Sequence, residues 1–169
     1  EGGKGIRCVS QLRQIGLANH LFGDDNNGMT CPWYDGTISG SWPRVLKSYA
    51  PCREISGTTY DAREVFYCPK LIELGSPPMT GGNYGYGGYP CNYSYNTKIS
   101  GVRDADGSSD PTYPLRYFSE FTRPERTVMA VDMLPRFTFG APNLLSVWGS
   151  GPDWWAGFVH NSRVNALAL

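Results

Sequence analysis

Residues 6–22 read IRCVSQLRQIGLANHLF, and this stretch has the clearest helical pattern in the chain. Leu12, Ile15 and Phe22 recur at spacings of three and seven residues, so in a helix they lie on one face. The sequence GDDNNG follows at 23–28, which is typical of a helix end and a turn. We therefore expect a helix over 6–22 that packs through Leu12, Ile15 and Phe22.

After this helix the pattern predicts short elements separated by long loops. A second, short helix is expected over 42–49, with Ser41 as its cap and Pro43 in its first turn. Strands are predicted at 64–67, 115–119, 127–131, 156–160 and 163–169, the last two joined as a hairpin through Asn161 and Ser162. The stretches 76–91, rich in glycine and tyrosine, and 101–114, which is polar, are expected to be loops. One long helix followed by short strands and loops indicates an α+β domain.

Length and charge narrow the class of protein. A chain of 169 residues suits one domain with a substantial hydrophobic core. Lys and Arg number 15 and Asp and Glu also number 15, so there is no basic excess to neutralise phosphates, and we expect no nucleic-acid partner. The sequence contains no apolar run of roughly 18–20 residues that could span a bilayer and no signal peptide.

The cysteine spacing favours disulfides over a metal site. The five cysteines are Cys8, Cys31, Cys52, Cys68 and Cys91. None belongs to a C-x-x-C pair, which structural zinc sites commonly use, so zinc is not expected. Disulfides in an oxidising compartment fit better, and the odd count leaves one thiol over or bonded outside the chain. The alternative is five buried, reduced cysteines that act as small apolar residues.

Candidate catalytic and calcium-binding residues are sparse. There is no G-x-S-x-G motif, and His20 and His160 lie far apart in sequence, so we expect no enzyme and assign no catalytic residue. Residues 104–110, DADGSSD, alternate oxygen ligands like half an EF-hand loop but lack the later bidentate Glu. The oxygen-rich stretch 24–27 follows a helix, where such residues commonly make turns. A solvated loop is therefore the default interpretation and calcium the alternative, with no other cofactor expected.

Clustered aromatic residues could form a binding surface. Flat rings can stack on sugar faces, and the candidates are Trp33, Tyr34, Trp148, Trp154 and Trp155. The same residues suit core packing or a subunit interface, where aromatic side chains carry much of the binding energy. Composition does not separate these roles, although packing or an interface is favoured.

Three segments, in order along the chain, carry a resemblance. The first is CVSQLRQIGLA at 8–18, followed by DDNNG at 24–28. The second is VFYCP at 65–69, and the third combines RPERTV at 123–128 with HNSRVN at 160–165. Together they resemble bacterial proteins with a prepilin-type cleavage and methylation signal, related to the pseudopilins of type II secretion. That group typically reads C-x-S-N-L-R/K-Q-I-G-x-A and then D-x-N-G in the first segment.

The resemblance implies a pilin-like α+β fold in which an N-terminal amphipathic helix packs on a small antiparallel sheet with long loops. Residues 1–28 would be the C-terminal half of the long pilin helix and its turn, and 29–169 the globular head. Members of the group carry an apolar helical stem before the first segment and continue past the final strand. We therefore expect that both ends of this chain are truncated.

The resemblance also implies the function: a structural subunit of a type IV pilus-like or pseudopilus filament. Such a subunit is exported, anchored in the inner membrane by its stem before assembly, and then self-associates, alone or with related minor pilins. The family positions make Cys8–Cys68 the first disulfide pair to expect. Cys52–Cys91 is a second guess, which leaves Cys31 over. The alternative function is an extracellular carbohydrate- or surface-binding module that uses the aromatic loops.

Overall fold

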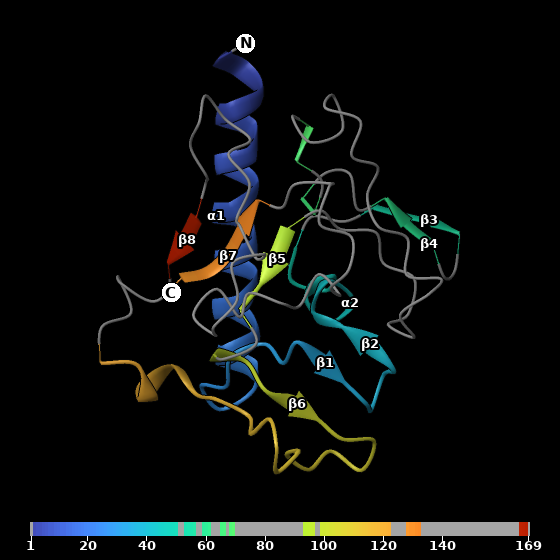
Figure 1. Ribbon diagram of the computed structural model, residues 1–169. Coiled ribbons are helices and arrows are strands. Elements are labelled where there is room, and N and C mark those ends of the chain that lie inside the picture. Colours follow the sequence, from blue (N-terminus) through green and yellow to red (C-terminus); the bar gives the residue numbers. More distant parts are fainter. Residues whose placement is uncertain are drawn as a thin grey trace, which may run out of the picture.

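Helix α1 (Gly2–Asp25) is the longest element of the fold, and small sheets lie along it (Figure 1). The computed structural model describes residues 2–50, 53–56, 59–61, 65–66, 68–69, 93–96, 99–122, 128–132 and 166–168. Within these residues the structure combines helices with short strands, so the chain has the expected α+β fold.

Helix α1 confirms the first prediction and extends it at both ends. Its C-terminal end lies at Asp25 rather than at Phe22, because the left-handed residues that stop it are Asn27, with φ of 56°, and Gly28, with φ of 80°. The Gly28 amide donates to the Gly23 carbonyl at 2.8 Å, and the Asn26 side-chain amide donates to the Phe22 carbonyl at 2.8 Å. These bonds satisfy carbonyls that a helix end would otherwise leave open.

A three-stranded antiparallel sheet packs beside α1. Its order is β5 (Tyr93–Tyr95), β7 (Val128–Asp132) and β8 (Ala166–Ala168), with β7 in the centre. Both β7 and β8 contact α1, and in Figure 1 β7 crosses the helix while β8 lies beside it. The strand predicted at 127–131 is therefore confirmed as β7.

A second, mixed sheet lies near the C-terminal end of α1 (Figure 1). Its strands are β1 (Tyr34–Asp35), β2 (Gly40–Ser41) and β6 (Val102–Arg103). β1 pairs antiparallel with β2 and parallel with β6, which brings Asp35 beside Arg103 although 67 intervening positions separate them in sequence. Helix α2 (Trp42–Leu46) follows β2 directly, and the 3₁₀ helix η3 (Phe118–Glu120) lies farther along the chain. Strands β3 (Arg53–Ser56) and β4 (Thr59–Asp61) form a separate antiparallel pair.

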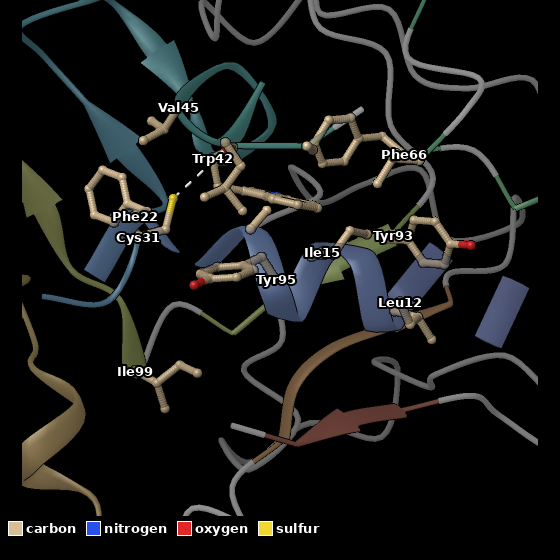
Figure 2. Packing of buried hydrophobic residues seen from close by; sticks show 14 of the residues in the cluster. Leu12, Ile15, Phe22, Cys31, Trp42, Val45, Phe66, Tyr93, Tyr95 and Ile99 are labelled. Carbon is tan, nitrogen blue, oxygen red and sulfur yellow. Dashed lines mark hydrogen bonds between the residues drawn. The ribbon is translucent and has the colours of Figure 1, made fainter. Parts of the chain in front are cut away.

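The core is built from aromatic and aliphatic side chains packed on one face of α1 (Figure 2). Trp42 stacks on Tyr95 with ring centroids 5.0 Å apart and meets Phe66 edge-on at 5.4 Å. Burial of each such side chain stabilises the fold by about 1.5–3 kcal/mol. The expected packing face of α1, consisting of Leu12, Ile15 and Phe22, is buried in this core.

Several predicted elements are wrong. Val65 and Phe66, predicted to lie in a strand, form a turn that buries both side chains in the core. The strand predicted at 115–119 is instead an isolated bridge between Tyr117 and Met29, followed by η3. A short run of apolar residues resembles a strand in sequence even where no strand forms, because burial of the side chains in the core requires apolar residues with or without strand pairing.

Other predictions hold only in part. Helix α2 ends at Leu46, so the expected span 42–49 is too long, and residues 47–50 are a turn. The polar stretch 101–114 contains strand β6 as well as loops. β8 falls within the predicted strand 163–169 and pairs with β7, whereas its expected hairpin partner 156–160 lies outside the described residues. The expected loop 76–91 also lies outside them.

Candidate functional site

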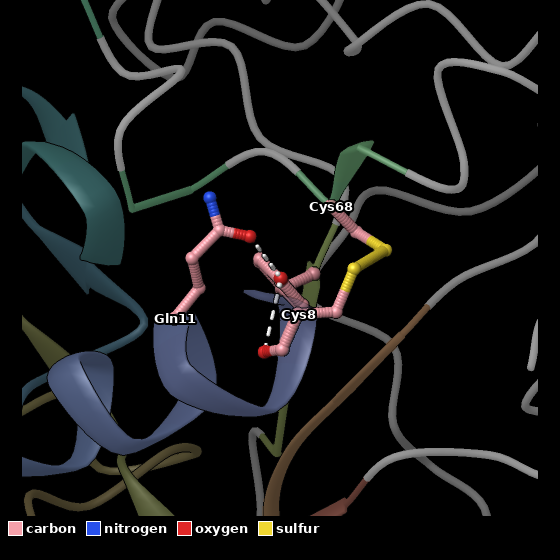
Figure 3. Close-up of a disulfide and its surroundings, with 4 residues drawn as sticks. Cys8, Gln11 and Cys68 are labelled. Carbon is pink, nitrogen blue, oxygen red and sulfur yellow. Dashed lines mark hydrogen bonds between the residues drawn. A yellow bond between two sulfur atoms is a disulfide. The ribbon is translucent and has the colours of Figure 1, made fainter. Parts of the chain in front are cut away.

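A disulfide joins α1 to the segment at residues 68–69. It links Cys8 and Cys68, the pair that the resemblance implied, and Figure 3 shows it beside Gln11. The Tyr93 hydroxyl donates to Gln11 Oε1 at 2.9 Å and reaches the Cys8 carbonyl at 3.4 Å, so strand β5 is held to the same turn of the helix. This cluster therefore ties three separate parts of the chain together. Cys52 and Cys91 lie outside the described residues.

Cys31 is a buried thiol rather than a reactive one. Its amide donates to Asn19 Oδ1 at 2.7 Å, and its Sγ donates to the Pro32 carbonyl at 3.4 Å. Burial, and secondarily the negative charge of Asp35, raises the pKa of the Cys31 thiol well above its ordinary value. Because the thiolate is the nucleophile, this environment favours a packing role.

Two carboxylates of the candidate calcium segment 104–110 accept hydrogen bonds from within the chain. Asp106 Oδ1 accepts from the Ser108 amide at 2.9 Å, and Asp110 Oδ1 accepts from the Thr112 amide at 2.6 Å. Hydrogen bonds from the side chain and backbone of Ser108 lower the pKa of Asp106. In the part of the chain that the structure describes, no three His, Cys, Asp or Glu side chains gather where they could hold a metal ion.

The histidine and tryptophan candidates occupy separate places. His20 stacks on Phe118, with ring centroids 4.7 Å apart and planes at 16°, so it packs against η3. Trp33 and Tyr34 are half-buried and their rings are tilted by 49°, which does not form one flat platform. The remaining candidates, His160, Trp148, Trp154 and Trp155, lie outside the described residues.

A polar cleft of about 360 Å³ opens where the C-terminal turn of α1 meets the mixed sheet. Its volume lies at the small end of the range of ligand pockets. Asp25, Asn27 and Arg103 supply polar groups to its lining, and Leu115 and Tyr117 supply an apolar wall. Of the described surface, this is the concave region where charged, amide and aromatic side chains converge, and we take it as the candidate site.

Arg103 is held firmly in the cleft. Its Nη1 forms an ion pair with Asp35 Oδ2 at 3.2 Å, and its Nη2 donates to Asn26 Oδ1 at 3.3 Å. The guanidinium also lies over the ring of Phe22, 5.9 Å from the centroid, and Nη2 is 3.7 Å from Met29 Sδ. Since only 18% of the Arg103 side chain is exposed, the guanidinium has little freedom to move.

Backbone hydrogen bonds fix the walls of the cleft around Arg103. The Gly36 amide donates to the Arg103 carbonyl at 2.6 Å, which anchors the turn between β1 and β2. The Asp104 amide donates to the Ser108 carbonyl at 2.9 Å and closes the loop that contributes Gly107. On the opposite side, the Phe118 amide donates to the Gly28 carbonyl at 2.8 Å. The walls of the cleft are therefore held by backbone hydrogen bonds within the chain.

Sequence reasoning missed this cleft. The stretches 24–27 and 104–110 were singled out for their oxygen atoms, and both contribute residues to the lining. Arg103 and Tyr117 carry no local motif, and they join the site only because β6 pairs parallel with β1 and because Tyr117 bridges to Met29. The density of polar turn residues around 24–28 and 104–110 was the available signal.

Comparison with known proteins gives no assignment: no protein family, characterised protein or solved structure matches this chain. Among the described residues, none of the helices combines the length and apolar character that crossing a membrane requires.

Proposed function

We propose that this protein is a structural subunit of a pilus-like or pseudopilus filament of the bacterial cell envelope, with a pilin-like fold. The sequence resemblance at 8–18, 24–28 and 65–69 motivates the proposal. One structural observation supports it: α1 is apolar on two sides. Its inner face is buried through Leu12 and Ile15, while a second row of large apolar side chains faces solvent.

The solvent-facing row consists of Ile6, Leu17 and Leu21, all exposed, with Leu17 at 60%. Ile6 and Leu17 are eleven positions apart and Leu17 and Leu21 are four apart, close to about three turns and about one turn of an α-helix. The three side chains therefore lie on one side of α1. Apolar side chains aligned on an exposed helix face are suited to contact with another helix.

Charge along α1 favours a shifted second copy as the partner. Arg7 and Arg13 lie in the N-terminal half of the helix, whereas Asp24 and Asp25 lie at its C-terminal end. Carboxylates at a helix C-terminus are unfavourable for the helix dipole, so a basic group from a neighbour would stabilise that end. A copy displaced along the axis brings its basic half toward the acidic end. Such a head-to-tail contact does not close on itself and generates a helical filament.

The proposal includes the remaining expectations from the resemblance. An apolar stem would continue α1 upstream, anchor the exported subunit in the inner membrane and then pack in the filament centre, because a helix that is apolar all round must be buried in lipid or among other helices. Assembly would involve copies of this chain, alone or with related minor pilins. The protein would act as a structural element without catalytic activity.

Sedimentation of two forms tests the proposal: residues 1–169 alone, and the same chain carrying an apolar stem. We expect the first to remain mainly monomeric and the second to pellet as filaments visible by electron microscopy. Leu17→Gln should reduce the pelleted fraction of the stem-bearing form. Ile38→Gln is the matched control, because Ile38 is also an exposed large apolar residue, at 40%, but lies in the turn between β1 and β2.

Two outcomes would count against the filament. One is a stem-bearing form that stays monomeric under conditions in which both variants keep their native circular dichroism. The other is an equal loss of pelleting for Leu17→Gln and Ile38→Gln, which would show that α1 contributes nothing particular to the contact.

A further inference from the structure

The cleft around Arg103 lies at the C-terminal end of α1, apart from the exposed row of Ile6, Leu17 and Leu21 that carries the proposed filament contact. Asp25 is the residue that the cleft shares with the acidic end of the helix. Its lining is not that of a packing defect: it combines amide, carboxylate and guanidinium groups with one exposed aromatic ring. We propose that this cleft binds a neutral sugar ring.

The charge balance of the cleft selects an uncharged ligand. The positive charge of Arg103 is matched by Asp35 at 3.2 Å, and Asp25 adds a carboxylate to the lining. An anionic ligand would be repelled by the carboxylate of Asp25, and Arg103 would offset this little because Asp35 already neutralises its charge. A metal cation would meet the guanidinium of Arg103, which holds its charge at all physiological pH values. A neutral polyol avoids both repulsions.

The polar groups match the hydroxyls of a sugar. Asp25 offers carboxylate acceptors, and Asn27 offers an amide with both a donor and an acceptor. Arg103, whose Nη1 and Nη2 already bond to Asp35 and Asn26, holds the wall of the cleft in place. Asp25 is oriented by the Tyr49 hydroxyl, which donates to its Oδ2 at 3.1 Å, and Asn26 is oriented by its bonds to Phe22 and Arg103. Neighbouring hydroxyls on a pyranose ring present donors and acceptors side by side, which such groups can bind together.

Tyr117 supplies the apolar half of the site. It lines the cleft and is 40% exposed. The face of an aromatic ring carries negative charge density, so it attracts the weakly positive C–H groups on the flat side of a pyranose. The backbone of Tyr117 is held by its bridge to Met29 and by its amide, which donates to Glu120 Oε1 at 2.9 Å, and this places the ring at the cleft.

Nuclear magnetic resonance titration of the folded chain with the methyl glycosides of glucose, galactose and mannose tests the proposal. At least one should shift the amide signals of Asn27, Gly107 and Tyr117 with a Kd on the order of 1 mM, so the titration should reach roughly 50 mM. Tyr117→Ala should raise that Kd about tenfold, equivalent to about 1.4 kcal/mol. Tyr113→Ala is the matched control: Tyr113 is 47% exposed but does not line the cleft, so its removal should leave the Kd unchanged.

A second variant tests the same site in case Tyr117→Ala does not fold. Asn27→Gly removes the side-chain amide while keeping a residue suited to the positive φ at this position, and it should also weaken binding. The proposal is overturned if none of the three glycosides shifts the cleft signals, or if Tyr113→Ala weakens binding as much as Tyr117→Ala. It is equally overturned if inorganic phosphate or calcium shifts these signals and the glycosides do not. Because the titration uses residues 1–169 without a stem, its outcome does not depend on whether the stem-bearing form makes filaments.

Discussion

Removal of the Cys8–Cys68 disulfide should destabilise the protein by about 4 kcal/mol. The bridge closes a loop with a sequence separation of 60 residues. The chain-entropy relation, evaluated at about 60 residues and 25 °C, gives about 4 kcal/mol for the restriction of the unfolded chain. For a protein of this size, each 1 kcal/mol corresponds to roughly 2–4 °C in Tm, so the expected loss is roughly 8–16 °C.

The assay is a thermal melt in a background that isolates this bridge. Replacement of Cys52 and Cys91 by Ser leaves Cys8, Cys68 and Cys31, so that reductant acts on one candidate pair. In this background we expect reductant to lower the Tm by the amount above. Without reductant, alkylation of the unfolded chain should label Cys31 alone.

Cys31→Ala serves as the matched control for the volume that a cysteine replacement removes, since Cys31 is buried and makes no disulfide. The double replacement of Cys8 and Cys68 by Ala should cost more than twice as much as Cys31→Ala. The reasoning is refuted if all three cysteines are alkylated without reductant, or if reductant shifts the Tm by less than about 2 °C, which corresponds to under 1 kcal/mol.

Four further predictions concern the core and the turns. Tyr95→Phe should stabilise the protein by about 1 kcal/mol, since Tyr95 Oη is buried and, among the described residues, makes no hydrogen bond. Tyr93→Phe should instead destabilise it by about 1–3 kcal/mol, because the hydrogen bond to Gln11 is lost. Urea denaturation measures both changes, and changes of the same sign would contradict the assignment. Because burial raises the pKa of Tyr95 well above its ordinary value, wild-type stability should fall as pH rises above about 10, the pKa in the unfolded chain, and more steeply than that of Tyr95→Phe. Gly101→Ala should lower the free energy of unfolding by about 3 kcal/mol or more, since a Cβ at its φ of 73° would meet the Pro114 carbonyl. Gly107→Ala should lower it by only about 1 kcal/mol, since its φ of 87° is similar but the space around it is open. Comparable losses for the two variants would show that the steric contact at Gly101 is unimportant. Cys31 should resist iodoacetamide in the folded protein and react rapidly in denaturant, whereas rapid labelling of the native state would place the thiol at the surface.

The first helix was predictable because its signal is local. Leu12, Ile15 and Phe22 repeat at the helical period, and the structure buries all three. The helix ends later than the sequence pattern predicts, because Gly23 matches the stop signal whereas the left-handed residues are Asn27 and Gly28. Either Gly23 or Gly28 fits the rule that a glycine follows a helix end. The position at which the helix ends depends on the hydrogen bond from the Gly28 amide to the Gly23 carbonyl.

The strands and the cleft depended on information that a local pattern does not contain. Val65 and Phe66 are apolar because they fill the core beneath Trp42, and this burial resembles a strand in sequence. Strands β1 and β6 have two residues each, too few to show any alternation. Their parallel pairing places Arg103 beside Asp35 and creates the floor of the cleft, so the site arises from tertiary structure and has no sequence motif of its own.

The measurement that tests the filament account most directly is mass spectrometry of the N-terminus of the protein isolated from its own cells. The account predicts a processed and methylated N-terminal residue, followed by an apolar stem of about 20 residues that leads into α1. A mature N-terminus at or close to Glu1, produced by removal of an ordinary signal peptide, would contradict it and favour a secreted binding module.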